Sequence, residues 1–239
     1  MSPDKRSQST DIIEHLSLGE LNVIGRMPYS SNATFLVEIS GDPSMRAIYK
    51  PGRGERGLWD FPEGLFMREV AAYELAVALG WDIVPPTVYR REGPLGEGSL
   101  QLFIDADFEQ HYFSLFERTE LHAQFKKFAV FDMIANNADR KSGHLLIDAS
   151  DHIWGIDQGL CFHSHPKLRT VVWEFAGEQI PEELLENLSA KKKNCMQSLA
   201  DFLIPEEFAA FEARIARVLK TRRFPVPDPD MRCYPWPLI

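Results

Sequence analysis

Apolar stretches and the turn residues between them divide the chain into a strand-rich first part and a helix-rich second part. In the first part, short apolar stretches bounded by turn residues predict strands over residues 20–26, 34–39, 46–50, 84–89 and 99–104. Residues 66–79 instead carry apolar side chains at helical spacing and end at Gly80, so a long helix is predicted there. The expected fold class is α+β, with a mixed, mainly antiparallel sheet in the first part.

The second part is predicted to be mainly helical. Helices are expected over residues 121–134, 182–188, 192–203 and 205–220, with a hairpin of two short strands at 145–147 and 153–156. This predicts a two-lobed chain with four segments: a disordered leader (1–11), an N-terminal lobe (12–105), to which the motifs below assign nucleotide binding, a C-terminal lobe (106–221), to which they assign catalysis, and an extended, proline-rich tail (222–239).

Two aspartates flank the predicted hairpin at one end. Asp139 lies in the polar run before its first strand, and Asp157 follows directly after its second strand. Because antiparallel strands bring these ends together, both carboxylates are expected close to each other. Mg²⁺ is usually held by one or two carboxylates together with substrate phosphates, so the pair predicts a site for metal-bound phosphate.

The spacing after Asp139 matches that of a kinase catalytic loop. In kinases an asparagine that binds a metal ion follows the catalytic aspartate as D-x-x-x-x-N. His144 takes that position here. Imidazole binds several metals, although Mg²⁺ prefers oxygen, so His144 is predicted either to bind the metal or to support the site while Asp157 binds it.

A lysine and a glutamate upstream complete the order of parts found in kinases. The predicted strand 46–50 ends in Lys50, and Glu69 follows near the start of the next helix. Lysine on a strand, glutamate on a helix and two downstream acids is the arrangement that binds nucleotide phosphates and metal in kinases. Glu74 is a minor alternative partner for Lys50, since it lies on another side of the helix from Glu69.

Three segments carry a resemblance to a known family. They are Tyr49-Lys50-Pro51, the helix and strand over residues 68–87, and the two acidic loops at 137–140 and 156–162. In this order they resemble the phosphatidylinositol 3- and 4-kinase superfamily, most closely its type II phosphatidylinositol 4-kinase-like branch and related bacterial proteins. The resemblance covers about residues 45 to 165 and implies a protein-kinase-like fold.

The resemblance also implies roles for individual residues. ATP would bind with Mg²⁺ or Mn²⁺, and Asp139 would orient the acceptor hydroxyl. The turn around Ser31 lies where kinases place a phosphate-covering loop, although an ordinary hairpin turn is an equal alternative. Phe103 and Ile104 lie in the expected hinge beside the nucleotide base. A separate zinc site at His163 and His165 is a weaker alternative, because no further ligand has matching spacing.

Composition narrows the possible partners. The formal net charge of −9 does not favour nucleic-acid binding, and no apolar run is long enough to cross a membrane. Three widely spaced cysteines fit a reducing cytoplasm. The palmitoylated cysteine-rich segment of the family's lipid kinases has no counterpart, which disfavours a lipid substrate.

The sequence therefore predicts a cytoplasmic, ATP- and metal-dependent phosphotransferase. Its acceptor is an unidentified hydroxyl of a protein or a soluble small molecule. Two alternatives stay open: a nucleotidyltransferase that uses the same fold, and a non-catalytic nucleotide-binding or scaffold pseudokinase.

Overall fold

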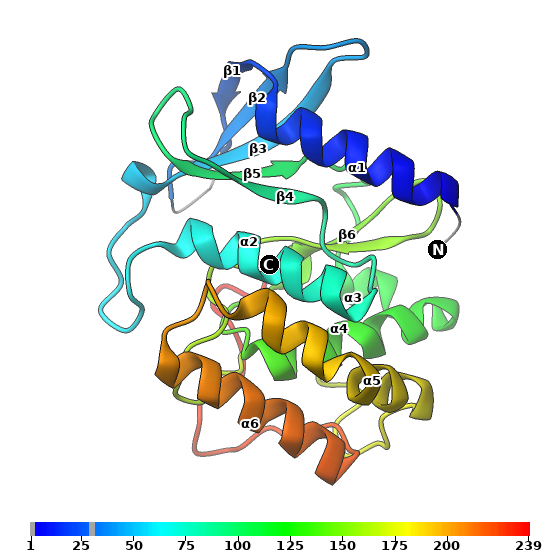
Figure 1. Cartoon of the computed structure of the whole chain (residues 1–239). Helices are drawn as coiled ribbons and strands as arrows, with labels where there is room; N and C mark the ends of the chain where they lie inside the picture. Colours follow the sequence, from blue (N-terminus) through cyan, green and yellow to red (C-terminus); the bar gives the residue numbers. More distant parts are fainter. Residues whose placement is uncertain (1–2, 29–31) are drawn as a thin grey trace. The chain divides into compact units, whose positions relative to one another are not determined.

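The computed structural model describes residues 3–28 and 32–239, and these form two compact units (Figure 1). The N-terminal unit contains the described residues up to Tyr73 together with Pro85–Ile104. The C-terminal unit contains Glu74–Val84 and Asp105–Ile239. The two-lobed α+β architecture predicted from sequence is thus confirmed. The segment Glu74–Val84, predicted within the first lobe, groups with the second.

The N-terminal unit is built on one antiparallel sheet of five strands in the order β1-β2-β3-β5-β4. The strands are β1 (Leu21–Arg26), β2 (Phe35–Ile39), β3 (Met45–Pro51), β4 (Thr87–Arg90) and β5 (Gly98–Leu102). The central strand β3 is bonded on both sides, with Lys50 opposite Ser99 of β5 and Tyr49 opposite Phe35 of β2. The strand that carries Lys50 is therefore an interior strand of the sheet, held by a neighbour on each side.

Helix α1 (Pro3–Leu18) occupies most of the stretch predicted as a disordered leader, and that prediction is wrong over these residues. Leu16 is fully buried against the apolar face of the sheet, and Ile12 and Ile13 pack on the same cluster. Arg90 of β4 donates hydrogen bonds of 3.0 Å to the carbonyls of Leu16 and Gly19. The sheet supplies the apolar contacts that a short polar helix lacks when isolated.

Helix α2 (Leu65–Leu79) follows the loop after β3 and is shared between the two units. The 3₁₀ turn η1 (Gly52–Gly54) opens that loop. The carboxylate of Glu55 accepts hydrogen bonds from the backbone N–H groups of Gly64 and Phe66, at 2.9 and 2.6 Å. It therefore satisfies donors that the first turn of a helix leaves unpaired.

The C-terminal unit is mainly helical. Its helices are α3 (Tyr112–Leu115), α4 (His122–Ala135), α5 (Glu182–Leu199) and α6 (Pro205–Thr221). Two short 3₁₀ turns are η2 (Thr119–Leu121) and η3 (Ser142–His144). The strands β6 (Leu145–Ile147) and β7 (Ile153–Gly155) form its hairpin. In α4, Phe125, Phe128 and Phe131 are fully buried. Helix α6 lies beside both α4 and α5.

One prediction for this unit is wrong: residues 182–199 form a single helix rather than two. The segment between the predicted pieces contains no glycine or proline that would end a helix. Leu188, Cys195 and Leu199 recur at helical spacing and are fully buried. Helix α6 begins with Pro205 at its first position, as predicted, and ends at Arg222 in the left-handed conformation.

The segment after α6 has no helix or strand, in agreement with the extended tail predicted from its prolines. It is nevertheless bonded to the C-terminal unit. The carbonyl of Cys233 accepts hydrogen bonds from the backbone of Thr170 and the indole of Trp173. The carbonyl of Leu238 accepts one from the N–H of Ser142, at 2.8 Å.

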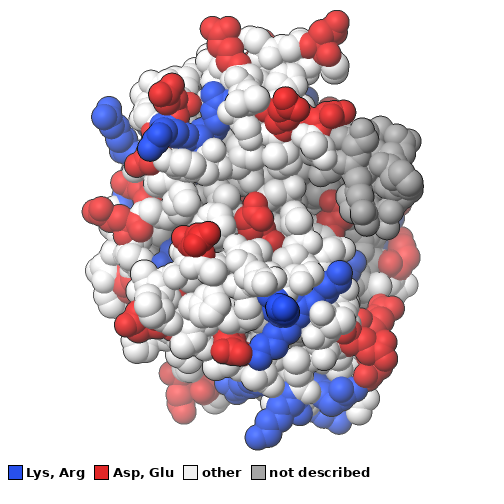
Figure 2. Space-filling model, in the orientation of Figure 1, with Lys and Arg blue, Asp and Glu red and all other residues white. Residues whose placement is uncertain are grey.

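Acidic side chains are scattered over the face of the molecule in Figure 2, with lysines and arginines in separate small groups among them. A broad basic surface, by which nucleic-acid-binding proteins contact phosphates, is not seen among the described residues on this face. Across residues 3–28 and 32–239, every helix is too short or too polar to cross a membrane.

Candidate active site

The side chains of Lys50 and Glu69 meet in the N-terminal unit. Lys50 is on β3 and Glu69 is on the first turns of α2, and Nζ of Lys50 lies 2.5 Å from Oε1 of Glu69. The structure therefore brings together the pair predicted from sequence. Glu74, the alternative partner, is half-buried on α2 in the C-terminal unit, where burial raises the pKa of its carboxyl.

The hinge segment is anchored to β3. The backbone N–H of Phe103 donates to the carbonyl of Arg46 at 3.0 Å, and the Arg46 guanidinium lies 4.6 Å from the centre of the Phe103 ring. Phe103 and Ile104 are both partly exposed. The N–H of Phe103 is therefore engaged with β3. Ser31, the predicted phosphate-loop residue, lies outside the described residues.

The loop that carries Asp139 begins where α4 ends. Asn136 ends the helix with a positive φ of 53°, a conformation that asparagine tolerates better than most residues. Its side-chain amide donates to the carbonyls of His163 and His165. The next asparagine, Asn137, accepts a hydrogen bond from the N–H of Asp139 at 3.0 Å. The hydrogen bonds of the two asparagines thus hold the loop backbone in place at Asp139.

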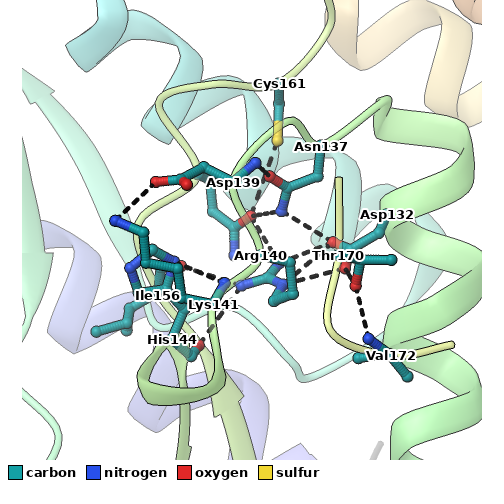
Figure 3. Close-up of polar contacts among 11 residues, drawn as sticks. Asp132, Asn137, Asp139, Arg140, Lys141, His144, Ile156, Cys161, Thr170 and Val172 are labelled. Carbon is teal, nitrogen blue, oxygen red and sulfur yellow. Dashed lines mark hydrogen bonds and ion pairs between the residues drawn. The ribbon is translucent and has the colours of Figure 1, made fainter. Parts of the chain in front are cut away.

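Arg140 lies at the centre of a buried polar network behind this loop (Figure 3). Its guanidinium forms a salt bridge with Asp132 of α4 at 2.9 Å, and neither side chain is exposed. It also donates to Oε1 of Gln158 at 2.8 Å and to the carbonyl of Ile156 at 3.1 Å. Thr170 donates to the same Asp132 carboxylate. Arg140 therefore ties the Asp139 loop to the loop that contains Asp157.

Asp139 points toward Lys141 in Figure 3, with 3.2 Å between Oδ2 of Asp139 and Nζ of Lys141. Burial raises the pKa of the Asp139 carboxyl; the Lys141 ammonium lowers it and the Asp157 carboxylate raises it. The electrostatic effect of Asp157 on Asp139 agrees with the prediction that these two acids lie near one another. Asp139 is therefore a partly desolvated carboxylate next to a cation, suited to accept or orient a proton.

His144 and Asp157 also meet in the C-terminal unit. Nε2 of His144 lies 3.3 Å from Oδ2 of Asp157. The other ring nitrogen, Nδ1, accepts the backbone N–H of Lys141 at 3.4 Å. Asp157 has a positive φ of 57°, and about half of its side-chain surface is exposed. Its carboxylate oxygens are thus accessible to a ligand from solution.

The donor set fits a magnesium or manganese ion that is completed by substrate. No group of three or more His, Cys, Asp or Glu side chains able to hold a metal occurs among the described residues. Oxygen donors from one or two carboxylates suffice when nucleotide phosphates and water supply the other ligands. The same result gives no support to the alternative of a zinc site at His163 and His165, whose rings lie 5.5 Å apart.

The sequence pattern did not identify the buried residues that support the site. Asp132, Gln158 and Thr170 are all buried and all belong to the Arg140 network. One signal was available, since Asp132 is an acid within an apolar helical stretch and buried carboxylates require a partner. The identity of that partner depends on tertiary contacts, which the sequence pattern does not specify.

Known proteins resemble this chain in sequence and in fold. Residues 79–202 match the family described as "Phosphatidylinositol 3- and 4-kinase". Protein Rv2133c of Mycobacterium tuberculosis is 37% identical over 265 residues, covering 94% of this chain and 95% of that protein. Among solved structures, that of hydra Fam20 with sugar matches with a TM-score of 0.63 at 12% identity, covering 92% of this chain and 90% of that one.

The Golgi casein kinase, in its structure with Mn/ADP bound, gives a TM-score of 0.58 at 14% identity, covering 96% of this chain and 81% of that chain. At such low identity these structures establish the kinase-like fold only. The family match covers more than half of the chain, and the mycobacterial relative matches nearly all of it. The chain belongs to the phosphatidylinositol 3- and 4-kinase family.

Proposed function

We propose that this protein is an ATP- and divalent-metal-dependent phosphotransferase that acts on a hydroxyl group. One observation carries the proposal: Arg140 bonds the loop of Asp139 to the loop of Asp157 from a fully buried position. Two carboxylate-bearing loops fixed to one another match the needs of phosphoryl transfer, in which catalysis is mainly positioning and electrostatic stabilisation.

Each residue is assigned a role on chemical grounds. Lys50 binds the nucleotide phosphates, and Glu69 orients its ammonium. Phe103 and Ile104 border the base. Asp157 binds the metal through its accessible oxygens. Ser31 remains a predicted phosphate contact.

Asp139 orients the acceptor hydroxyl and takes up its proton. The desolvation that raises its pKa makes it a stronger base than an exposed aspartate. Lys141, in contact with Asp139, lowers the pKa of its carboxyl against the effect of burial and adds positive charge beside the reacting group. The metal ion supplies charge neutralisation to the phosphates when it is bound.

The acceptor is proposed to be a protein or a soluble small molecule, and the compartment to be the cytoplasm. The support is the acidic net charge and the three cysteines, which form no disulfide with one another in the structure. The negatively charged surface of the cytoplasmic leaflet attracts clusters of Lys and Arg, so it does not attract a protein with a negative net charge.

A labelling experiment tests the reaction type. Purified protein is incubated with Mg²⁺ or Mn²⁺ and with ATP labelled at either the γ- or the α-phosphate. Label from the γ-position on the protein or an added acceptor supports phosphoryl transfer. Label from the α-position supports nucleotidyl transfer. Saturable ATP binding without transfer to protein, added acceptors or water supports a non-catalytic nucleotide-binding protein.

A further inference from the structure

The two ring nitrogens of His144 have different partners, and this determines which of them carries the proton. Nδ1 is 3.4 Å from the backbone nitrogen of Lys141, which can only donate. Nδ1 must therefore present its lone pair. A neutral imidazole has one donor and one acceptor, so the proton lies on Nε2. That nitrogen is 3.3 Å from Oδ2 of Asp157, an acceptor.

A metal ligand would require the opposite arrangement. Metal coordination through Nε2 uses the lone pair of that nitrogen and leaves the proton on Nδ1. The Nδ1 proton would then face the N–H of Lys141, and two donors would oppose each other. His144 is also largely enclosed, with 12% of its side-chain surface exposed. Ligation through Nε2 would thus break the contacts on both sides of the ring.

We propose that His144 is a positioning residue, which donates a hydrogen bond from Nε2 to Asp157 and does not bind the metal. The imidazole spans from the backbone of Lys141, in the catalytic loop, to the carboxylate of Asp157. Its own carbonyl accepts the N–H of Ile156 at 3.0 Å, so main chain and side chain of His144 connect the same two loops.

This arrangement restrains the carboxylate that would bind the metal. The hydrogen bond from Nε2 of His144 to Oδ2 limits the rotation of the Asp157 side chain. Partners that orient a metal-binding carboxylate raise metal affinity by holding it in one rotamer, and their removal typically lowers affinity about 10–100-fold. The role of Asp157 as the metal ligand rests on the proposed function, whereas the proton position of His144 does not.

Nuclear magnetic resonance decides the proton position directly. The long-range nitrogen–proton spectrum of the full ¹⁵N-labelled chain distinguishes the two tautomers of each of its seven histidines. Comparison with His144→Gln assigns the His144 signals. We expect the Nε2–H form in the free protein and also with Mg²⁺ and a non-hydrolysable ATP analogue. An Nδ1–H form in either state would overturn the proposal.

Metal titrations give an independent readout. The affinities for Mg²⁺ and Mn²⁺ are measured in the presence of the ATP analogue for wild type, His144→Phe and His144→Gln. We expect His144→Phe to weaken both metals about 10-fold or more by the same factor. His144→Gln should recover much of this loss, because its amide can donate to Asp157. Exposed His165 provides the control, and His165→Gln should change neither affinity.

A different result follows if His144 is a ligand. Nitrogen ligands favour Mn²⁺ over Mg²⁺, so removing the imidazole would lower the affinity for Mn²⁺ much more than that for Mg²⁺. A changed ratio of the two affinities in His144→Phe would therefore contradict the proposal. Failure of the protein to bind the nucleotide at all would instead refute the proposed function, and the tautomer in the free protein would still decide between donor and ligand.

Discussion

Nζ of Lys50 lies 2.5 Å from Oε1 of Glu69, and only 18% and 6% of their side-chain surfaces are exposed. A charge held in such surroundings depends on its partner, because removing one member leaves the other charge desolvated and unpaired. The pair is set by two well-supported elements, the central strand β3 and the capped start of α2. Glu69 therefore holds the Lys50 ammonium in one direction.

This contact predicts the effect of two substitutions on nucleotide binding. Lys50→Ala should weaken ATP affinity by about 1.5–3 kcal/mol, or roughly 10- to 150-fold, since a charge-assisted hydrogen bond to phosphate is lost. Glu69→Gln should weaken it less, because the lysine remains but is no longer held. The measurement is the rise in melting temperature with ATP and Mg²⁺ or Mn²⁺.

Glu74→Gln is the matched control on the same helix. Burial raises the pKa of Glu74, so its ionised form is unfavourable in the folded protein and the neutral amide should leave stability unchanged or raise it. ATP affinity should stay at the wild-type value. Equal losses of ATP affinity in Glu69→Gln and Glu74→Gln would contradict a specific role for Glu69.

The raised pKa of Asp139 predicts opposite effects of one substitution on stability and on turnover. A carboxyl whose pKa is higher in the folded than in the unfolded state makes the protein less stable as the pH rises through that window. Asp139→Asn should therefore raise the melting temperature of the nucleotide-free protein at neutral pH. Turnover should fall about 10²- to 10⁴-fold, since the acceptor loses its base.

Comparison of binding and activity in this variant separates the two effects. ATP should bind to Asp139→Asn as it binds to wild type, and γ-phosphate transfer should be nearly lost. Wild-type turnover in the variant would show that another group orients the acceptor. A strong loss of thermal stability would show that the folded protein favours the ionised form of Asp139.

The order of elements could be predicted because it depends on local patterns, and the pairing of Lys50 with Glu69 because the order of these residues matches that of kinases. Strand and helix periodicity, turn residues and Pro205 at a helix start are all visible in the sequence. Residues 3–11 were predicted as a disordered leader, whereas they belong to helix α1, whose polar sequence is stabilised by Leu16 packing on the sheet. The single α5 was also missed: two helices were predicted, over 182–188 and 192–203, whereas α5 is continuous through residues 189–191.

The acidic residues of the candidate site could be predicted from the sequence, but the contacts that position them could not. Asp139 and Asp157 stand at the ends of recognisable strands, so their closeness follows from the hairpin. The bond from Arg140 to Asp132 joins a loop to the preceding helix, and its geometry follows from how that helix packs. The proton position of His144 depends on the Lys141 backbone and on Asp157, which no residue spacing specifies.

The fully buried pair of Arg140 and Asp132 predicts a large and specific stability effect. Arg140→Met should destabilise the fold by about 3–5 kcal/mol, because Asp132 is left as a buried charge without its partner. The double variant Arg140→Met with Asp132→Leu should recover part of this loss, since neither charge is then buried. Urea unfolding of the two variants and the wild type measures both values.

An exposed ion pair in the same unit provides the control. Nζ of Lys192 lies 2.8 Å from Glu212, and both side chains are at least one-third exposed. Lys192→Ala should cost at most about 1 kcal/mol, as surface ion pairs usually do. Equal effects of Lys192→Ala and Arg140→Met would mean that the Arg140 network contributes no more than a surface contact.

The turn between β6 and β7 predicts a pH dependence of stability. Burial disfavours the ionised form of Asp148, but hydrogen bonds from Ser150, from the indole of Trp154 and from the backbone of His152 outweigh it and lower its pKa from 3.8 to about 2. A depressed folded-state pKa stabilises the protein above the unfolded-state value, and this stabilisation is lost as the pH falls from about 4 to about 2.

Asp148→Asn should therefore be less stable than wild type at neutral pH by about 1 kcal/mol, a value reduced for screening at a partly exposed carboxylate. The difference should shrink between about pH 4 and pH 2, where the wild-type carboxyl becomes protonated. Unfolding midpoints at a series of pH values measure it, with the exposed Asp201→Asn as control. A stability difference between Asp148→Asn and wild type that stays constant down to pH 2 would contradict the low pKa. This difference decreases only if the wild-type carboxylate becomes protonated in that range.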